Sequence, residues 1–214
     1  MAGVIAAGSI PAALALLARD GAAQGTIPAE VADLLNFALK LEYLESELYT
    51  RGLAASGLIP AGDRPVFTQI AKHEAAHVAL LKATLGAAAI GKPAIDLTAR
   101  GTFGDVLSNY VTFKVVAQAL EDTGVRAYQG QAVALMGSSV LPTALRIHSV
   151  EARHAAQVRR LRGQKGWITA NQTDVTRLAL VYAGEDNVER GPSAAFDEPL
   201  TIPQVLAIVT PFFP

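Results

Sequence analysis

A pattern of four residues that occurs twice constrains this chain more than any other feature of its sequence. Each copy has a Glu, a Tyr seven residues later, and a Glu-x-x-His motif about thirty residues after the first Glu. The first copy is Glu42, Tyr49, Glu74 and His77, and the second is Glu121, Tyr128, Glu151 and His154. Residues three apart share one side of a helix, so each Glu-x-x-His presents a carboxylate and an imidazole on one face. The interval within each copy fits one helix, a turn and half of the next helix.

Four antiparallel helices with this pattern would gather four carboxylates and two imidazoles in an apolar interior. Unpaired ions in a protein interior cost several kcal/mol each, even after relaxation. Two divalent cations would neutralise the four negative charges, and carboxylate and imidazole donors together suit iron or manganese. One Glu from each of two helices and a Glu-x-x-His from each of the other two is a known donor set of helix bundles. We therefore predict two Fe or Mn ions bound by Glu42, Glu74, His77, Glu121, Glu151 and His154.

Within this set, Glu74 and Glu151 are expected to bridge the ions, and the other four donors to bind one ion each. Tyr49 and Tyr128 are expected to be outer hydrogen-bond partners that orient the ligands, although simple core packing is the competing interpretation. Glu45 lies three residues after Glu42 and could face the same cavity, so it is kept as the substitute for Glu42. Glu47 is expected to be solvated.

Two alternatives compete with the dinuclear site. Most helical glutamates face solvent, but the flanking sequences FALKLEYL and VVAQALED place these on or beside an apolar stripe. Residues 73–77 also match the H-E-x-x-H zinc protease motif. The third ligand of that motif is missing, because position 83 is Ala and no Glu occurs between Glu74 and Glu121. His73 and His148 are then either outer partners or surface residues, and the surface interpretation is preferred.

Composition narrows the class of protein. The 214 residues carry a net charge of −1 with 18 basic and 19 acidic residues, which favours neither nucleic acid nor anionic lipid as a partner. Cysteine is absent, which excludes disulfides, thiolate zinc sites and cysteine nucleophiles. Residues 2–18 are apolar but broken by Gly and Pro, so no integral membrane span is predicted. They resemble the apolar part of an export signal without its basic start. An upstream start and an extra segment packed on the bundle both stay open.

The periodicity of apolar residues predicts an all-α four-helix bundle. A leader over 1–25, a bundle over 26–163 and a C-terminal extension over 164–214 that packs on the bundle are the expected divisions. Gly and Pro over 87–103 suit a long crossover that joins two parallel helices. The helices are expected over 28–52, 63–85, 105–136 and 139–163, with a short one over 173–182.

The segments LLNFALKLEYLESELY, AKHEAAHVALLKATLG and IHSVEARHAAQVRRLRG resemble the ferritin-like domain family, which includes bacterial stress proteins and plant desiccation-related proteins. The resemblance implies a four-helix bundle with its crossover between the second and third helices, and puts all six predicted donors on the family's ligand positions. The tail is also similar, and cage-forming ferritins lack such a tail, so a storage shell is not implied. Members are often exported, which favours an exported or periplasmic location.

The expected function is redox chemistry at the metal pair with O2 or H2O2 as substrate: ferroxidase, peroxidase or catalase-like. The alternative is a non-catalytic stress or desiccation protein that binds metal structurally. Metal identity, electron donor and oligomeric state, a homo-oligomer included, are left open by the sequence.

Overall fold

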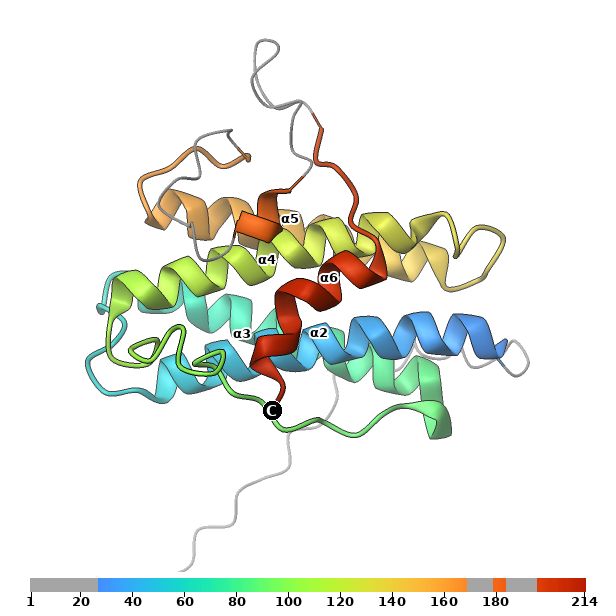
Figure 1. Ribbon diagram of the computed structural model, residues 1–214, viewed down its shortest axis with the longest axis horizontal. Helices are drawn as coiled ribbons and strands as arrows, with labels where there is room; N and C mark the ends of the chain where they lie inside the picture. Colours follow the sequence, from blue (N-terminus) through green and yellow to red (C-terminus); the bar gives the residue numbers. More distant parts are fainter. Residues whose placement is uncertain (1–26, 169–178, 184–195) are drawn as a thin grey trace, which may run out of the picture.

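The computed structural model describes residues 27–168, 179–183 and 196–214, and these form an all-α fold without a strand (Figure 1). The expectations for residues 1–25 and for most of 173–182 fall outside these ranges. The predicted fold class is confirmed. The elements are α2 (Ala29–Ala54), α3 (Arg64–Leu85), η1 (Gly86–Ala88), α4 (Tyr110–Ala132), α5 (Leu141–Leu161), α6 (Ile202–Val209) and η4 (Thr210–Phe212).

The four long helices form two antiparallel pairs, in which α2 packs against α3 and α4 against α5. Residues 89–109 pass along the length of the bundle before α4 begins, so α3 and α4 run in the same direction (Figure 1). This connection is the crossover that the Gly and Pro residues predict. It makes α2 and α4 antiparallel neighbours, and these are the helices that carry the two Glu-x6-Tyr pairs.

The third long helix is shorter than the sequence predicts. It starts at Tyr110, whereas the prediction placed its start near Asp105. The Asn109 side chain accepts a hydrogen bond from the Val111 backbone N–H at 2.9 Å. Asn109 is therefore the N-cap, and the helix begins with the residue after it. The helix also finishes earlier than predicted, at Ala132.

Apolar residues form two core clusters, and the polar residues of the repeated pattern lie between them. Phe113 on α4 belongs to one cluster, Leu135 just after the end of α4 belongs to the other, and Glu121 falls between the two in the chain. The order is reversed on α5. Ile147, before Glu151, belongs to the same cluster as Leu135, whereas the α5 residues of the other cluster come after Glu151. Each end of the bundle is therefore closed by packed side chains, and the polar cluster is enclosed at mid-length.

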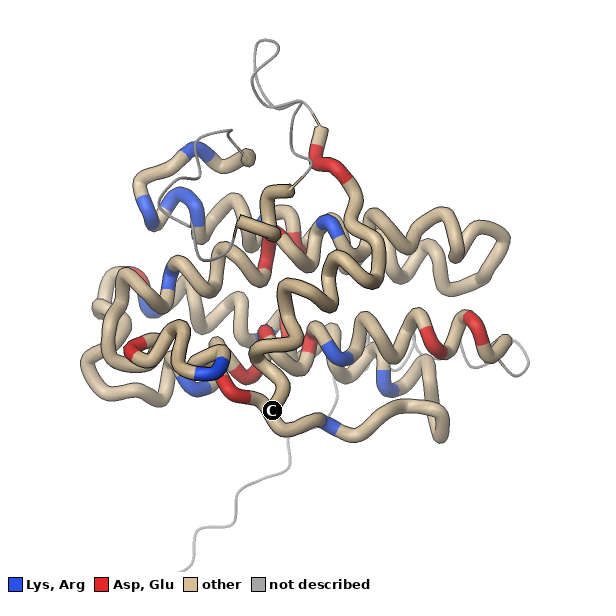
Figure 2. Tube along the Cα trace, in the orientation of Figure 1, with Lys and Arg blue, Asp and Glu red and all other residues tan. Residues whose placement is uncertain are grey.

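Charged residues outside this cluster are dispersed. Figure 2 shows Lys and Arg positions spread along the described trace, with acidic positions among them. None of the helices in the described ranges has the length and apolar character needed to cross a membrane.

A C-terminal helix, α6, crosses the outside of α4 (Figure 1). The tail packs on the bundle as expected from the sequence, but its helix was not predicted. Thr201 and Gln204 carry the missed signal, because the Gln204 Oε1 accepts from the Thr201 backbone N–H at 2.8 Å, as in a capping box. Just before α6, the Leu200 backbone N–H donates to the Arg126 carbonyl at 3.0 Å, which fixes the tail to α4.

The Arg126 side chain extends this attachment. It is 1% exposed, and its guanidinium donates to the backbone carbonyls of Glu198 at 2.6 Å and Ala183 at 2.8 Å. A third donation goes to the carbonyl of Val181. One buried arginine on α4 therefore holds two segments that are separate in sequence.

Gly130→Ala is expected to loosen the tail. A Cβ at Gly130 would lie 1.9 Å from the Leu200 carbonyl oxygen, so the backbone on one side must move. We expect faster proteolytic cleavage within residues 196–214, although alanine favours the helix itself by about 1 kcal/mol. Gly91→Ala is the control, because a Cβ there meets nothing within 4 Å. Equal cleavage rates in the two variants would contradict this attachment.

Candidate metal centre

The structure brings the six predicted donors together at mid-length of the bundle. They form two groups in which the donor atoms all lie within 4.8 Å of one another. Glu74 and Glu151 belong to both groups, which is the relation expected of bridging carboxylates. The groups are Glu42, Glu74, His77 and Glu151, and Glu74, Glu121, Glu151 and His154.

Each imidazole presents its Nδ1 to three carboxylates. The His77 Nδ1 lies 2.8 Å from Glu151 Oε1, 3.2 Å from Glu42 Oε2 and 3.4 Å from Glu74 Oε2. The His154 Nδ1 lies 2.8 Å from a Glu74 oxygen and 3.4 Å from a Glu151 oxygen, and Glu121 Oε2 is also at 3.4 Å. On its Nδ1 side each imidazole therefore faces the same kind of carboxylate set, as the repeated sequence pattern predicts.

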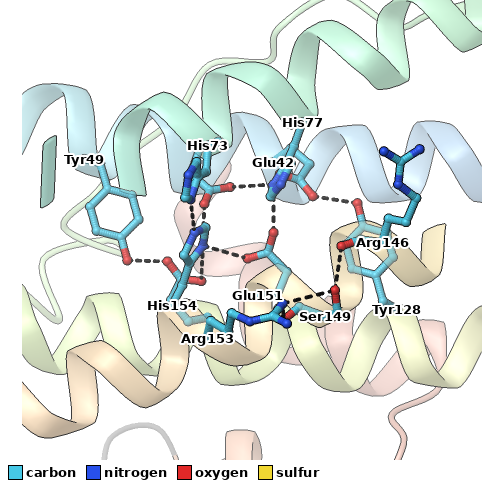
Figure 3. Close-up of polar contacts among 12 residues, drawn as sticks. Glu42, Tyr49, His73, His77, Tyr128, Arg146, Ser149, Glu151, Arg153 and His154 are labelled. Atoms are coloured by element: carbon cyan, nitrogen blue, oxygen red, sulfur yellow. Dashed lines mark hydrogen bonds and ion pairs between the residues drawn. The ribbon is translucent and has the colours of Figure 1, made fainter. Parts of the chain in front are cut away.

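The two tyrosines cross between the copies of the pattern. The Tyr128 hydroxyl donates to Glu42 Oε1 at 2.5 Å, and the Tyr49 hydroxyl donates to Glu121 Oε1 (Figure 3). Each tyrosine thus holds the lone carboxylate of the opposite copy, because α2 and α4 are antiparallel. Burial raises the pKa of both phenols well above the usual value, and the neighbouring carboxylate adds to the shift, so both remain hydrogen donors.

The donor atoms lie close together, but several of them make no hydrogen bond. All four carboxylates are fully buried, and the two imidazoles are at most 8% exposed. Among the described residues, six buried donor atoms have no hydrogen-bond partner: both oxygens of Glu74 and of Glu151, Glu121 Oε2 and His154 Nδ1. Buried polar atoms are rarely left unpaired. The residues present therefore fit two cations, which would satisfy these atoms and balance four negative charges.

The protonation states in the absence of metal show how unfavourable the cluster is alone. Burial raises the pKa of the Glu74 carboxyl to about 7 and that of Glu121 to about 8, despite the nearby imidazoles. Burial lowers the pKa of His154, but the carboxylates of Glu121, Glu151 and Glu74 outweigh it and raise the pKa to about 12. In the metal-free protein, protons on these groups reduce the net negative charge of the cluster, which bound cations would otherwise do.

The match to a known family agrees with this geometry. Residues 30–164 match the ferritin-like domain. The chain belongs to the ferritin-like domain family. The match covers the four long helices apart from Ala29, and therefore every residue of the repeated pattern, and it leaves α6 outside. No curated protein matches the chain. The resemblance drawn from the sequence is thus confirmed for the family.

Glu45 and Glu47 differ in their positions. Glu45 is buried at 3% exposure but stands outside both donor groups, whereas Glu42 belongs to one of them. Glu47 is partly exposed and pairs with Lys92 at 2.5 Å, away from the centre.

His73 has a closer relation to the centre than the preferred surface interpretation allowed. Its Nδ1 lies 2.9 Å from the outer ring nitrogen of His154, Nε2, and the two rings stack with centroids 5.1 Å apart (Figure 3). The His73 Nε2 lies 2.7 Å from Gln69 Nε2, one helical turn earlier. His73 therefore orients His154 from outside. Its position four residues before His77 places it on the same face of α3 and could have indicated this role. Its distance to α5 could not be read from the sequence. His148 is partly buried, and its Nε2 has no partner among the described residues.

A buried ion pair beside the centre was also missed. Asp122 follows Glu121 directly and pairs with Arg159 of α5, and the Tyr182 hydroxyl donates to the same carboxylate at 2.8 Å. Asp122 and Arg159 are at most 3% exposed. Because this carboxylate already has partners, it is not available as a further donor to the centre.

His73→Ala is expected to lower metal affinity by roughly 10- to 100-fold, the usual effect of removing an outer partner of a ligating histidine. Competition with a chelator would measure the change. The control is Lys72→Ala, which alters an exposed neighbour on the same helix. Wild-type affinity in the His73 variant would show that His154 needs no support from α3.

Proposed function

We propose that the chain binds two Fe or Mn ions through Glu42, Glu74, His77, Glu121, Glu151 and His154 and carries out redox chemistry with O2 or H2O2. When bound, such a pair supplies two adjacent redox-active cations that a small oxidant can reach together. Ferroxidase, peroxidase and catalase-like reactions are the candidate activities. A role in stress or desiccation protection, an exported location and a homo-oligomeric state belong to the same proposal.

One observation carries the proposal: the two donor groups share Glu74 and Glu151, and both carboxylates leave both of their oxygens without a hydrogen bond. A carboxylate that bridges two cations uses both oxygens in this way. Structural salt bridges would instead satisfy the oxygens with N–H donors, as Arg159 does for Asp122.

The chain's own residues hold the donors in place before any cation binds. Tyr128 and Tyr49 each occupy one oxygen of a lone carboxylate, which leaves the second oxygen of Glu42 and of Glu121 facing an imidazole. His73 holds the outer nitrogen of His154. The packed clusters at both ends of the bundle restrict water around the donors. Fixed donors in an enclosed site reduce the reorganisation that ligand exchange or oxidant binding requires.

The experiment is metal analysis combined with turnover. The purified full chain is loaded with Fe(II) or Mn(II), the ions bound per chain are counted, and the consumption of O2 and H2O2 is followed. Two ions per chain with turnover would support the proposal. Two ions without turnover would support the alternative of a non-catalytic metal-binding protein. A folded protein that binds none would refute both.

A further inference from the structure

The two copies of the pattern differ at the position three residues after the lone Glu. Glu45 follows Glu42 by three residues on α2, and Gly124 follows Glu121 by three residues on α4. The crossed hydrogen bonds pair each lone Glu with the tyrosine of the opposite helix. Positions 45 and 124 lie between Glu and Tyr on each helix, so they face each other where α2 and α4 cross. One copy has a carboxylate there, and the other has no side chain.

Gly124 makes room for the Glu45 carboxylate. A Cβ built on Gly124 would lie 3.0 Å from Glu45 Oε1 and 3.9 Å from Glu151 Cγ. The first distance is tighter than ordinary van der Waals contact, whereas the second is normal. Glycine in a helix interior costs about 1 kcal/mol relative to alanine, so its presence here fits a need for the space.

The Glu45 carboxylate is enclosed and lacks a neutralising partner. Glu45 is 3% exposed, and no hydrogen bond or ion pair joins its carboxylate to another residue in the described ranges. The charges that act on it come from Glu151, Glu121, Glu42 and Glu74, which are all donors of the proposed centre. Every other buried acidic residue that we describe has a tyrosine, an arginine or an imidazole close to it.

We propose that Glu45 is a fifth carboxylate donor to the metal pair, and that it fills the space beside Gly124 that a small external anion would otherwise take. This inference rests on the proposed function, because it requires the two ions. It goes further by giving the centre a donor that only one of the two copies supplies. Small carboxylates and azide are the ligands that the space would accept once Glu45 is removed.

Glu45→Ala tests the proposal on the full chain loaded with Co(II), whose visible absorption reports changes in its ligands. We expect Co(II) affinity to fall by at least roughly tenfold. We also expect azide to produce a saturable spectral change in the variant, at concentrations that leave the unsubstituted protein unchanged. Acetate should restore part of the lost affinity. An unchanged affinity, the absence of a saturable azide response, or an equal response in the unsubstituted protein would each overturn the proposal.

Glu45→Gln is the matched variant, because it keeps the volume and removes the charge. It should weaken Co(II) binding without opening the space to azide. Helix content measured by circular dichroism checks folding, and if the Ala variant fails to fold, the Gln variant alone decides: wild-type affinity in it would overturn the proposal.

Gly124→Ala gives an independent test through a double-mutant cycle. Its methyl group should displace the Glu45 carboxylate and lower Co(II) affinity in the unsubstituted background, but have no effect once Glu45 is Ala. Equal effects in both backgrounds would overturn the proposed contact. Failure of the metal pair itself is distinguishable, because the unsubstituted protein would then bind fewer than two Co(II) ions.

Discussion

Glu74→Ala is expected to reduce the bound metal from two ions per chain to less than one. Glu74 belongs to both donor groups, so its removal takes a ligand from each ion at once. Loss of Glu42, which belongs to one group only, should leave the other ion better held. Metal analysis after gel filtration, with protein concentration measured on the same sample, gives the occupancy.

Glu47→Ala is the matched control for this prediction. Glu47 lies on the same helix as Glu42, but it pairs with Lys92 at the surface. Its variant should retain two ions. Equal occupancy in the Glu74 and Glu47 variants would contradict the ligand assignment.

The Glu74 substitution should also have an effect of opposite sign on the metal-free protein. Both Glu74 oxygens are buried and without hydrogen-bond partners, so the carboxylate is unfavourable when no cation is bound. Glu74→Gln keeps the shape and removes the charge. We expect its metal-free form to unfold at a higher temperature than the unsubstituted metal-free protein at pH 8. A lower unfolding temperature would indicate that the carboxylate is stabilised by the protein alone.

The second large effect is a reversal of the pH dependence of stability on metal binding. In the metal-free protein the pKa of Glu74 is raised from 4.5 to about 7 and that of Glu121 to about 8. Below pH 4.5 both the folded and unfolded chains carry these protons. Between pH 4.5 and 8 the folded chain keeps protons that the unfolded chain releases. The free energy of unfolding therefore falls as pH rises, by about 1.4 kcal/mol per pH unit for each retained proton.

The histidines act in the same direction, because the pKa of His154 is raised to about 12 and its contribution is lost as pH rises above its usual value of 6.5. Metal binding reverses the trend, since cations compete with protons for the same carboxylates and imidazoles. The metal-loaded protein should be more stable at pH 8 than at pH 5. Thermal unfolding from pH 5 to 8, with chelator and with Mn(II), measures both curves. Parallel curves, or full metal retention at pH 4, would contradict the prediction.

Local patterns in the sequence were sufficient for the fold class, the family and the residues worth testing as ligands. Glu-x-x-His is legible in a sequence because a helix puts residues three apart on one face. The matched Glu-x6-Tyr intervals marked Glu42 and Glu121 as the lone carboxylates of the two copies. Gly and Pro over residues 87–103 marked the crossover for the same reason, since their effects on the backbone are local.

Contacts between helices were beyond the reach of such patterns. His73 reads as a surface residue because its partner, His154, lies on another helix. Glu45 reads as a substitute for Glu42 because its relation to Gly124 depends on the crossing of α2 and α4. Arg126 has no local sign of burial, and its carbonyl partners come from the segments that precede α6.

The sequence by itself determined the presence and order of the four long helices, which faces carry acidic and imidazole groups, and the family that the chain belongs to. Those properties follow from spacing along one helix. Only the tertiary structure decided which tyrosine holds which carboxylate, which histidine orients another, and which glutamate remains without a partner. Those properties depend on distances between helices, which the packing of the two apolar clusters sets.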